Sequence, residues 1–159
     1  MYTKITDLII DIDGIDTYDL CSSWRWCLAD MNNVFIISKM GDMFFLGKDE
    51  GIYWLAIDSG GILTKIAKSL QEFEELLNIY DNIDNWFLPV LVEQLNKSAI
   101  CLNKNEVYSY KKLPVIGGEY KIDNIEPTDI SVHFELTGQI CEQIKNLPDG
   151  TKVKIVVKE

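Results

Sequence analysis

The side chains best suited to chemistry in this sequence are a single histidine, four cysteines and a run of aspartates. Any catalytic dyad that uses imidazole has to use His133, the only histidine. No serine lies in a G-x-S-x-G turn of the kind that exposes a nucleophile. We expect His133 to lie at the end of a strand and to bond a backbone group. An enzyme is therefore the least favoured class.

The cysteines, Cys21, Cys27, Cys101 and Cys141, include no C-x-x-C pair. Without a secretory signal, reduced thiols are the default. The two nearest cysteines lie six positions apart with no histidine close to them in sequence, which is not the spacing of a zinc site. We predict no metal and no cofactor.

The aspartate run places four carboxylates within nine residues: Asp11, Asp13, Asp16 and Asp19. A calcium-binding EF-hand loop needs D-x-[DN]-x-[DN]-G and a glutamate at its twelfth position. Here a glycine follows Asp13 directly, and the twelfth position counted from Asp11 is Ser22. The spacing favours a solvated acidic loop and a helix cap over a calcium site.

The sequence also contains a glycine pair, Gly117-Gly118, which follows Leu113-Pro114. Neither this pair nor Gly60-Gly61 has the spacing of a phosphate-binding loop. The later pair marks a place where backbone or another chain approaches closely, and the sequence leaves both readings open. Gly117, Gly118 and His133 form our candidate pocket, should the chain be a small-molecule-binding or regulatory module.

The chain is acidic, with a formal net charge of −10 over 159 residues and a pI near 4.5. Nucleic acid and anionic membrane are disfavoured as direct partners, because both require basic surface. The N-terminus resembles no signal peptide, and no apolar run approaches the roughly 18 residues of a membrane span. We expect a cytoplasmic protein, for which a basic protein partner is the electrostatic complement.

Hydrophobic periodicity predicts an α+β fold in one domain, residues 1–159. The first part, about 20–67, should hold a helix over 20–31 and strands over 34–37, 43–46, 52–57 and 62–67, joined as antiparallel hairpins by glycine turns. The second, about 69–96, should be a helical pair. Its first helix begins at a Ser69/Glu72 capping box and its second near Asp84, with Pro89 in the first turn.

The third part, about 99–157, should begin with a hairpin of strands 99–102 and 107–110. A loop or irregular strand over 116–122, a strand over 130–134 and a helix over 136–147 follow. Alternation of lysine with valine or isoleucine predicts a last strand over 152–157 at a sheet edge, where lysine discourages further pairing. Strands and helices are segregated, so we expect an antiparallel or mixed sheet packed with helices.

Taken together, these segments resemble the C-terminal domain of bacterial type VI secretion immunity proteins of the Tdi class. The matching pieces, in chain order, are Trp24-Arg25-Trp26, Gly41-Asp42, Ile52-Tyr53-Trp54-Leu55, Phe73, Trp86-Phe87, Tyr108-x-Tyr110, Leu113-Pro114, Gly117-Gly118, Asn124, Val132-His133, Gly138-Gln139, Gln143 and Leu147-Pro148-Asp149-Gly150. Their order and spacing cover nearly the whole chain. Founding members carry a further N-terminal domain, so the resemblance is to their C-terminal part.

The resemblance implies a non-enzymatic cytoplasmic protein that binds and neutralises a cognate toxin, in the founding case a DNase. It also implies a more distant similarity to the SUKH superfamily of α+β immunity proteins. If the toxin is a basic nuclease, acidic side chains are the expected contacts: Asp11, Asp13, Asp16, Glu119, Asp123 and Glu126. The sequence leaves the toxin and the oligomeric state open.

Overall fold

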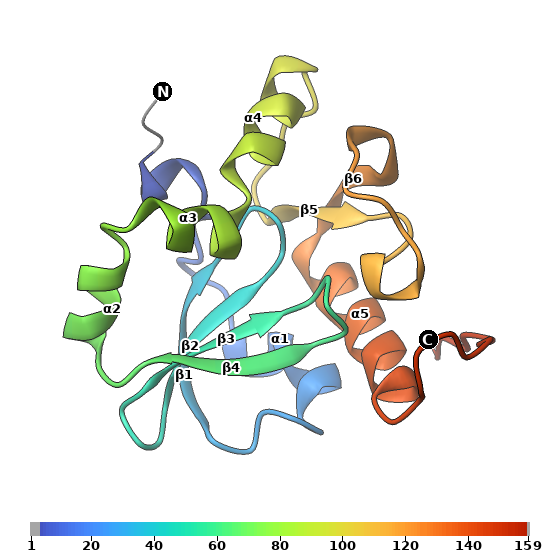
Figure 1. Cartoon of the computed structure of the whole chain (residues 1–159), viewed down its shortest axis with the longest axis horizontal. Coiled ribbons are helices and arrows are strands. Elements are labelled where there is room, and N and C mark those ends of the chain that lie inside the picture. The colour runs from blue at the N-terminus through green and yellow to red at the C-terminus, as the bar shows by residue number, and fades with distance from the viewer. Residues whose placement is uncertain (1–3, 159) are drawn as a thin grey trace.

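Residues 4–158 are described by a computed structural model, whose first sheet is a four-stranded antiparallel meander (Figure 1). Its strands follow one another in space as they do in sequence: β1 (Met31–Ile37), β2 (Met43–Gly47), β3 (Ile52–Ala56) and β4 (Ile62–Ala67). All four predicted strands and their antiparallel pairing are confirmed. Glycines with positive φ at positions 41, 60 and 61 permit the tight connections.

The central strand β2 is buried on both faces, because helices cover both sides of the meander (Figure 1). On one side Phe44 stacks on Phe87 with ring centroids 5.0 Å apart and also contacts Phe73 and Trp86. On the other side the Cys21 thiol lies 3.6 Å from the sulfur of Met43. Apolar side chains from most elements therefore meet in one core around this strand.

Three helices follow the meander: α2 (Leu70–Leu76), α3 (Tyr80–Phe87) and α4 (Pro89–Lys97). The capping interaction is confirmed, since Ser69 Oγ accepts from Glu72 N at 3.1 Å. The prediction that one helix begins near Asp84 is wrong. The chain instead passes through a left-handed residue, Leu88 at φ 51°, and α4 begins at Pro89. Proline is favourable at the first helical position, where its missing N–H leaves no bond unmade.

The N-terminal helix predicted over 20–31 is also wrong. Two short elements replace it: α1 (Thr17–Leu20), capped by Asp16, and the 3-10 turn η2 (Ser22–Trp24). Another 3-10 turn, η1 (Ile5–Asp7), lies nearer the N-terminus. Met31, the last residue of the predicted helix, is the first residue of β1 and pairs with Gly47.

A second, two-stranded antiparallel sheet joins β5 (Glu106–Tyr110) to β6 (Ile125–Asp129). The predicted hairpin between 99–102 and 107–110 is wrong, because β5 takes its partner from beyond a loop with the 3-10 turns η3 (Pro114–Ile116) and η4 (Ile122–Asn124). Pro127 lies opposite Tyr108 in this pairing. A strand with a proline suits a two-stranded sheet, in which each strand has one free edge.

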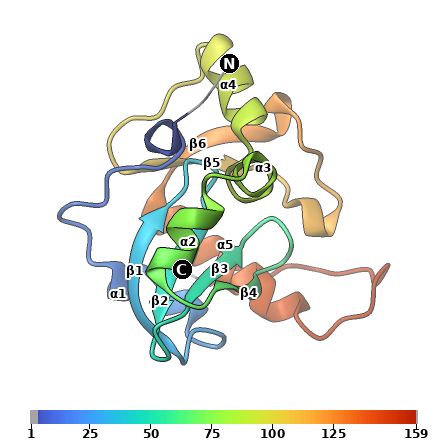
Figure 2. The ribbon, with the colours of Figure 1, turned by 60° about the vertical axis from the view of Figure 1, so that its left-hand side comes forward.

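The last helix, α5 (Ile130–Ile144), occupies residues predicted as a strand over 130–134 and most of those predicted as a helix over 136–147. Asp129 begins it, since one carboxylate oxygen accepts from the N–H groups of Ser131 and Val132. The predicted strand over 152–157 is wrong, because these residues belong to neither sheet. Figure 2 shows the turn that follows α5, in red, projecting from the body at the right.

The predicted α+β class is confirmed, because the described residues 4–158 contain two antiparallel sheets and five α-helices. None of those helices combines the length and the apolar character that a bilayer span requires.

Candidate interaction site

His133 is fixed in the core by two hydrogen bonds that join three elements. It lies on the first turns of α5, with a relative exposure of 1%. Its Nε2 donates to the carbonyl of Gly41 at 2.9 Å, and Ser109 on β5 donates its hydroxyl to Nδ1 at 2.8 Å. The predicted bond to a backbone group is confirmed. The predicted place at a strand end is wrong, because the residue is helical.

The Ser109–His133 pair has the spacing of a nucleophile and base, but its environment suits structure rather than catalysis. Burial lowers the pKa of His133 to about 4, although the bond to Gly41 acts in the opposite direction. An effective general base titrates near the working pH. Ser109 is itself buried, and the group that orients the imidazole is a carbonyl rather than a carboxylate. The pair therefore ties α5 to β5 and to the turn before β2.

Asp42, in the same turn, is a fully buried carboxylate with both oxygens bonded. Trp54 Nε1 donates to one oxygen at 3.0 Å, and the backbone N–H of Ile57 donates to the other at 2.9 Å. Burial, followed by the nearby charge of Asp58, raises the pKa of Asp42 well above its ordinary value. Because its lone pairs are directed inward, Asp42 holds the meander together and offers no contact to a partner.

The loop between β5 and η4 is clamped by Asn124. Its side-chain Nδ2 donates to the carbonyls of Lys112 and Glu119, both at 2.9 Å, and its Oδ1 accepts from Lys112 N at 3.0 Å. Gly118 lies so close to the Lys112 carbonyl that a Cβ atom there would overlap it. This decides the question that the glycine pair left open: the close approach is made by the chain's own backbone.

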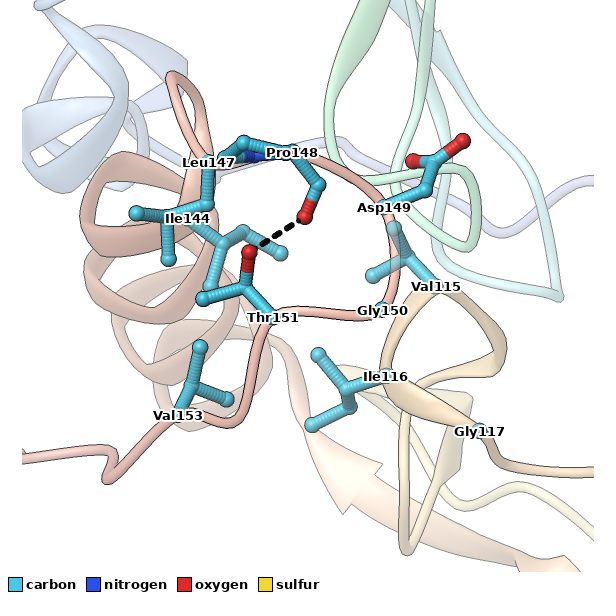
Figure 3. A pocket seen from close by; sticks show the side chains of 10 residues that line it. All are labelled: Val115, Ile116, Gly117, Ile144, Leu147, Pro148, Asp149, Gly150, Thr151 and Val153. Carbon is cyan, nitrogen blue, oxygen red and sulfur yellow. Dashed lines mark hydrogen bonds between the residues drawn. The ribbon is translucent and has the colours of Figure 1, made fainter.

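A hollow of about 430 Å³ lies between this loop and the end of α5 (Figure 3). Figure 3 shows the aliphatic side chains of Ile116, Ile144 and Val153 around it. Its volume suits a small ligand, but such sites also need a few converging polar groups. The hydroxyl of Thr151, which lines the hollow, already donates to the carbonyl of Pro148 at 2.6 Å.

The three candidate pocket residues are not gathered around this hollow. Gly117 lines it, whereas Gly118 faces the Lys112 carbonyl and His133 is enclosed in the core. A ligand-binding role for the three together remains a prediction.

The six candidate contact residues are all exposed, and they form two groups along the chain. One group precedes or caps α1 and the other follows the loop into β6: Asp11, Asp13 and Asp16, then Glu119, Asp123 and Glu126. Figure 2 places the first segment, in blue, at the left edge and the loop, in orange, at the right. The two groups therefore present separate acidic surfaces, and their role in binding remains a prediction.

Some of these carboxylates also have local structural tasks. Asp11 accepts from Asp13 N at 2.9 Å, and Asp16 accepts from Asp19 N at 3.0 Å as the cap of α1. Glu119 forms an exposed ion pair with Lys121 at 3.3 Å. Across residues 4–158, the histidine, cysteine and acidic side chains form no group of three or more suited to a metal ion.

The sequence did not predict that Gln139 and Gln143 bind the C-terminal segment. Both lie on the exposed side of α5, and each side-chain amide bonds the backbone of one residue in the C-terminal segment, Val156 or Lys158. The signal available in the sequence was the i, i+4 spacing of two glutamines, which places them one turn apart on the same side of a helix.

Residues 67–141 match the family model described as T6SS immunity protein Tdi1, C-terminal. The matched region runs from the end of β4 through most of α5 and includes the Asn124 clamp, His133 and Gln139. It confirms the resemblance noted in the sequence over these residues. No curated protein and no solved structure matches the chain.

Proposed function

We propose, from the match of residues 67–141 to the family model described as T6SS immunity protein Tdi1, C-terminal, that the chain captures one cognate toxin and blocks the toxin's access to substrate. The family match carries this proposal, because a family of immunity proteins implies toxin neutralisation. The chain acts as a single binding unit, residues 1–159, in the cytoplasm where an incoming toxin does its damage. Its mechanism is stoichiometric and involves no turnover.

The distribution of polar groups supports binding rather than catalysis. Two groups that chemistry could have used, His133 and Asp42, are buried and bonded within the fold. Exposed carboxylates remain, on a chain with a net charge of −10. A nuclease toxin needs basic surface to hold phosphates. Such opposite charges steer encounter and raise association rate constants to about 10⁸–10⁹ M⁻¹s⁻¹ at low salt.

The decisive experiment is co-expression with the toxin encoded beside this gene. We expect the chain to restore growth of cells that produce the toxin and to co-purify with it in a 1:1 complex. A toxin from an unrelated locus serves as the specificity control. If the chain neither rescues growth nor co-purifies with the adjacent toxin, the proposed function is wrong.

Two charge-neutralised variants then map the surface. One replaces Asp11, Asp13 and Asp16 with asparagine, which at position 16 keeps a helix-capping side chain. The other replaces Glu119, Asp123 and Glu126 with their amides. Neutralising the group that faces the toxin should lower the association rate constant at least tenfold at low salt and weaken the dependence of that constant on salt. A third variant with Glu74, Glu75 and Asp81 as amides, on exposed positions of α2 and α3, is the matched control.

A further inference from the structure

Helix α5 holds the C-terminal segment, residues 151–158, through two side-chain amides. Gln143 accepts from Val156 N at 3.2 Å and donates to Val156 O at 2.8 Å. Gln139 accepts from Lys158 N at 2.7 Å and donates to Lys158 O at 3.1 Å. Each glutamine thus satisfies both backbone groups of one residue, in the way that a neighbouring strand would.

The spacing of the two amides suits an extended chain. Residues i and i+4 of a helix are about 6 Å apart along its axis, since the rise is about 1.5 Å per residue. Residues i and i+2 of a strand are about 6.6 Å apart, and their backbone groups point to the same side. One turn of α5 therefore presents a two-point receptor that matches alternate residues of any extended segment.

The receptor recognises backbone and places little demand on side chains. Val156 is 57% exposed although its backbone N–H and carbonyl are both bonded, and Lys158 is exposed as well. Proline is the residue that the site excludes, because it lacks the N–H that each glutamine oxygen receives.

Another chain could displace residues 151–158 from the two glutamines without disturbing the core. All residues of this segment except Ile155 are exposed, and none belongs to the buried core. It is connected to α5 through an exposed turn that contains Pro148 and ends at Gly150, whose φ of 80° is natural for glycine. Opening this turn would free the receptor without disturbing the sheets.

The charges around Gln139 and Gln143 indicate which partner segment would bind there. The C-terminal segment carries Lys152, Lys154 and Lys158, although the chain as a whole has a net charge of −10. Glu142 lies beside the two glutamines and is the acidic side chain in this part of the surface. A basic extended segment is therefore the electrostatically matched ligand.

We propose that Gln139 and Gln143 form a docking site for a basic, proline-free extended segment of a partner protein, and that the C-terminal segment occupies this site until the partner displaces it. The partner segment gains the same four hydrogen bonds to the two glutamine amides. The site is defined by the chain's own geometry, so the inference does not require that the partner be a toxin.

The test releases the C-terminal segment from Gln139 and Gln143 in the full-length chain. Val156→Pro together with Lys158→Pro removes both N–H donors and keeps residues 155 and 157 extended. The probe is a fluorescein-labelled peptide with the sequence of residues 151–158. It should bind the emptied chain at least tenfold more tightly than the wild type, in which the tethered segment competes at an effective concentration of order millimolar. Adding Gln139→Ala and Gln143→Ala should abolish binding.

A peptide N-methylated at the positions of Val156 and Lys158 is the backbone control and should not bind. An unchanged melting temperature of each variant will show that the core is intact. Equal peptide binding with and without the two glutamines, or no binding to the emptied chain, would overturn the proposal. Growth rescue is measured separately, so a chain that rescues growth but fails the peptide assay loses only this site, not the immunity function.

Discussion

Replacing His133 with glutamine should reduce the loss of unfolding free energy that the protein undergoes as the pH falls. The imidazole is enclosed, and its pKa lies near 4 in the folded chain against 6.5 for an unperturbed group. Between these values the unfolded chain binds a proton that the folded chain does not. The free energy of unfolding therefore falls as the pH falls, and this contribution is fully present above pH 6.5 and lost near pH 4.

The magnitude follows from the same two values. The difference between 6.5 and about 4 corresponds to about 3 kcal/mol, because one pH unit is worth about 1.4 kcal/mol. Asp42 acts in the opposite sense, since its raised pKa favours the folded chain as the pH falls. It is present in both proteins, so comparing the wild type with His133→Gln isolates the histidine. Glutamine does not titrate and retains an N–H donor for the Gly41 carbonyl.

Urea unfolding followed by tryptophan fluorescence at pH 7.5, 6, 5 and 4 measures the effect. The wild type should lose about 3 kcal/mol more than His133→Gln over this range. A second readout is direct, because the chain has one histidine and its ring proton gives one NMR titration. Parallel stability curves for the two proteins, or a titration midpoint between pH 6 and 7, would refute the buried neutral imidazole.

Three further predictions concern packing, capping and thiol reactivity. Gly138→Ala should destabilise by about 2 kcal/mol or more, although alanine ordinarily favours a helix, because its Cβ would lie 2.5 Å from the Ser23 carbonyl oxygen; a higher melting temperature would contradict this packing. Ser69→Ala should cost about 1 kcal/mol in urea unfolding through loss of the α2 cap, whereas Ser69→Asp should restore most of it. In a thiol-reagent assay the exposed Cys101 should react first. Cys21, whose pKa burial raises to about 12, should react only on unfolding, and equal rates for the two thiols would count against the assigned burial.

The meander could be predicted because its information is local. Strands β1 to β4 are short apolar runs, and turns such as the one at Gly41 connect each to its neighbour in space. The same holds for the α2 cap, where Ser69 and Glu72 lie within one helical turn. These features depend on contacts between residues close in sequence, so periodicity and turn chemistry suffice to identify them.

The errors occur where distant residues compete for the same segment. Residues 99–102 resemble one half of a hairpin, yet β5 pairs with β6, whose position depends on the Asn124 clamp between them. The β-branched and aromatic residues after Asp129 alternate like a strand, yet α5 forms there and packs along η2. Intrinsic propensities differ by less than about 1 kcal/mol per residue, so burial against the rest of the fold overrides them.

By itself, the sequence determined the α+β class, the order of the meander, the acidity of the surface and the resemblance to an immunity family. All of these follow from composition, short-range pattern and the order of small motifs. Only the tertiary structure decided that His133 joins three elements in the core, that Gly118 accommodates the chain's own backbone, and that two glutamines hold the C-terminal segment. The roles of these side chains depend on partners far away in sequence, and folding alone brings those partners within hydrogen-bonding distance.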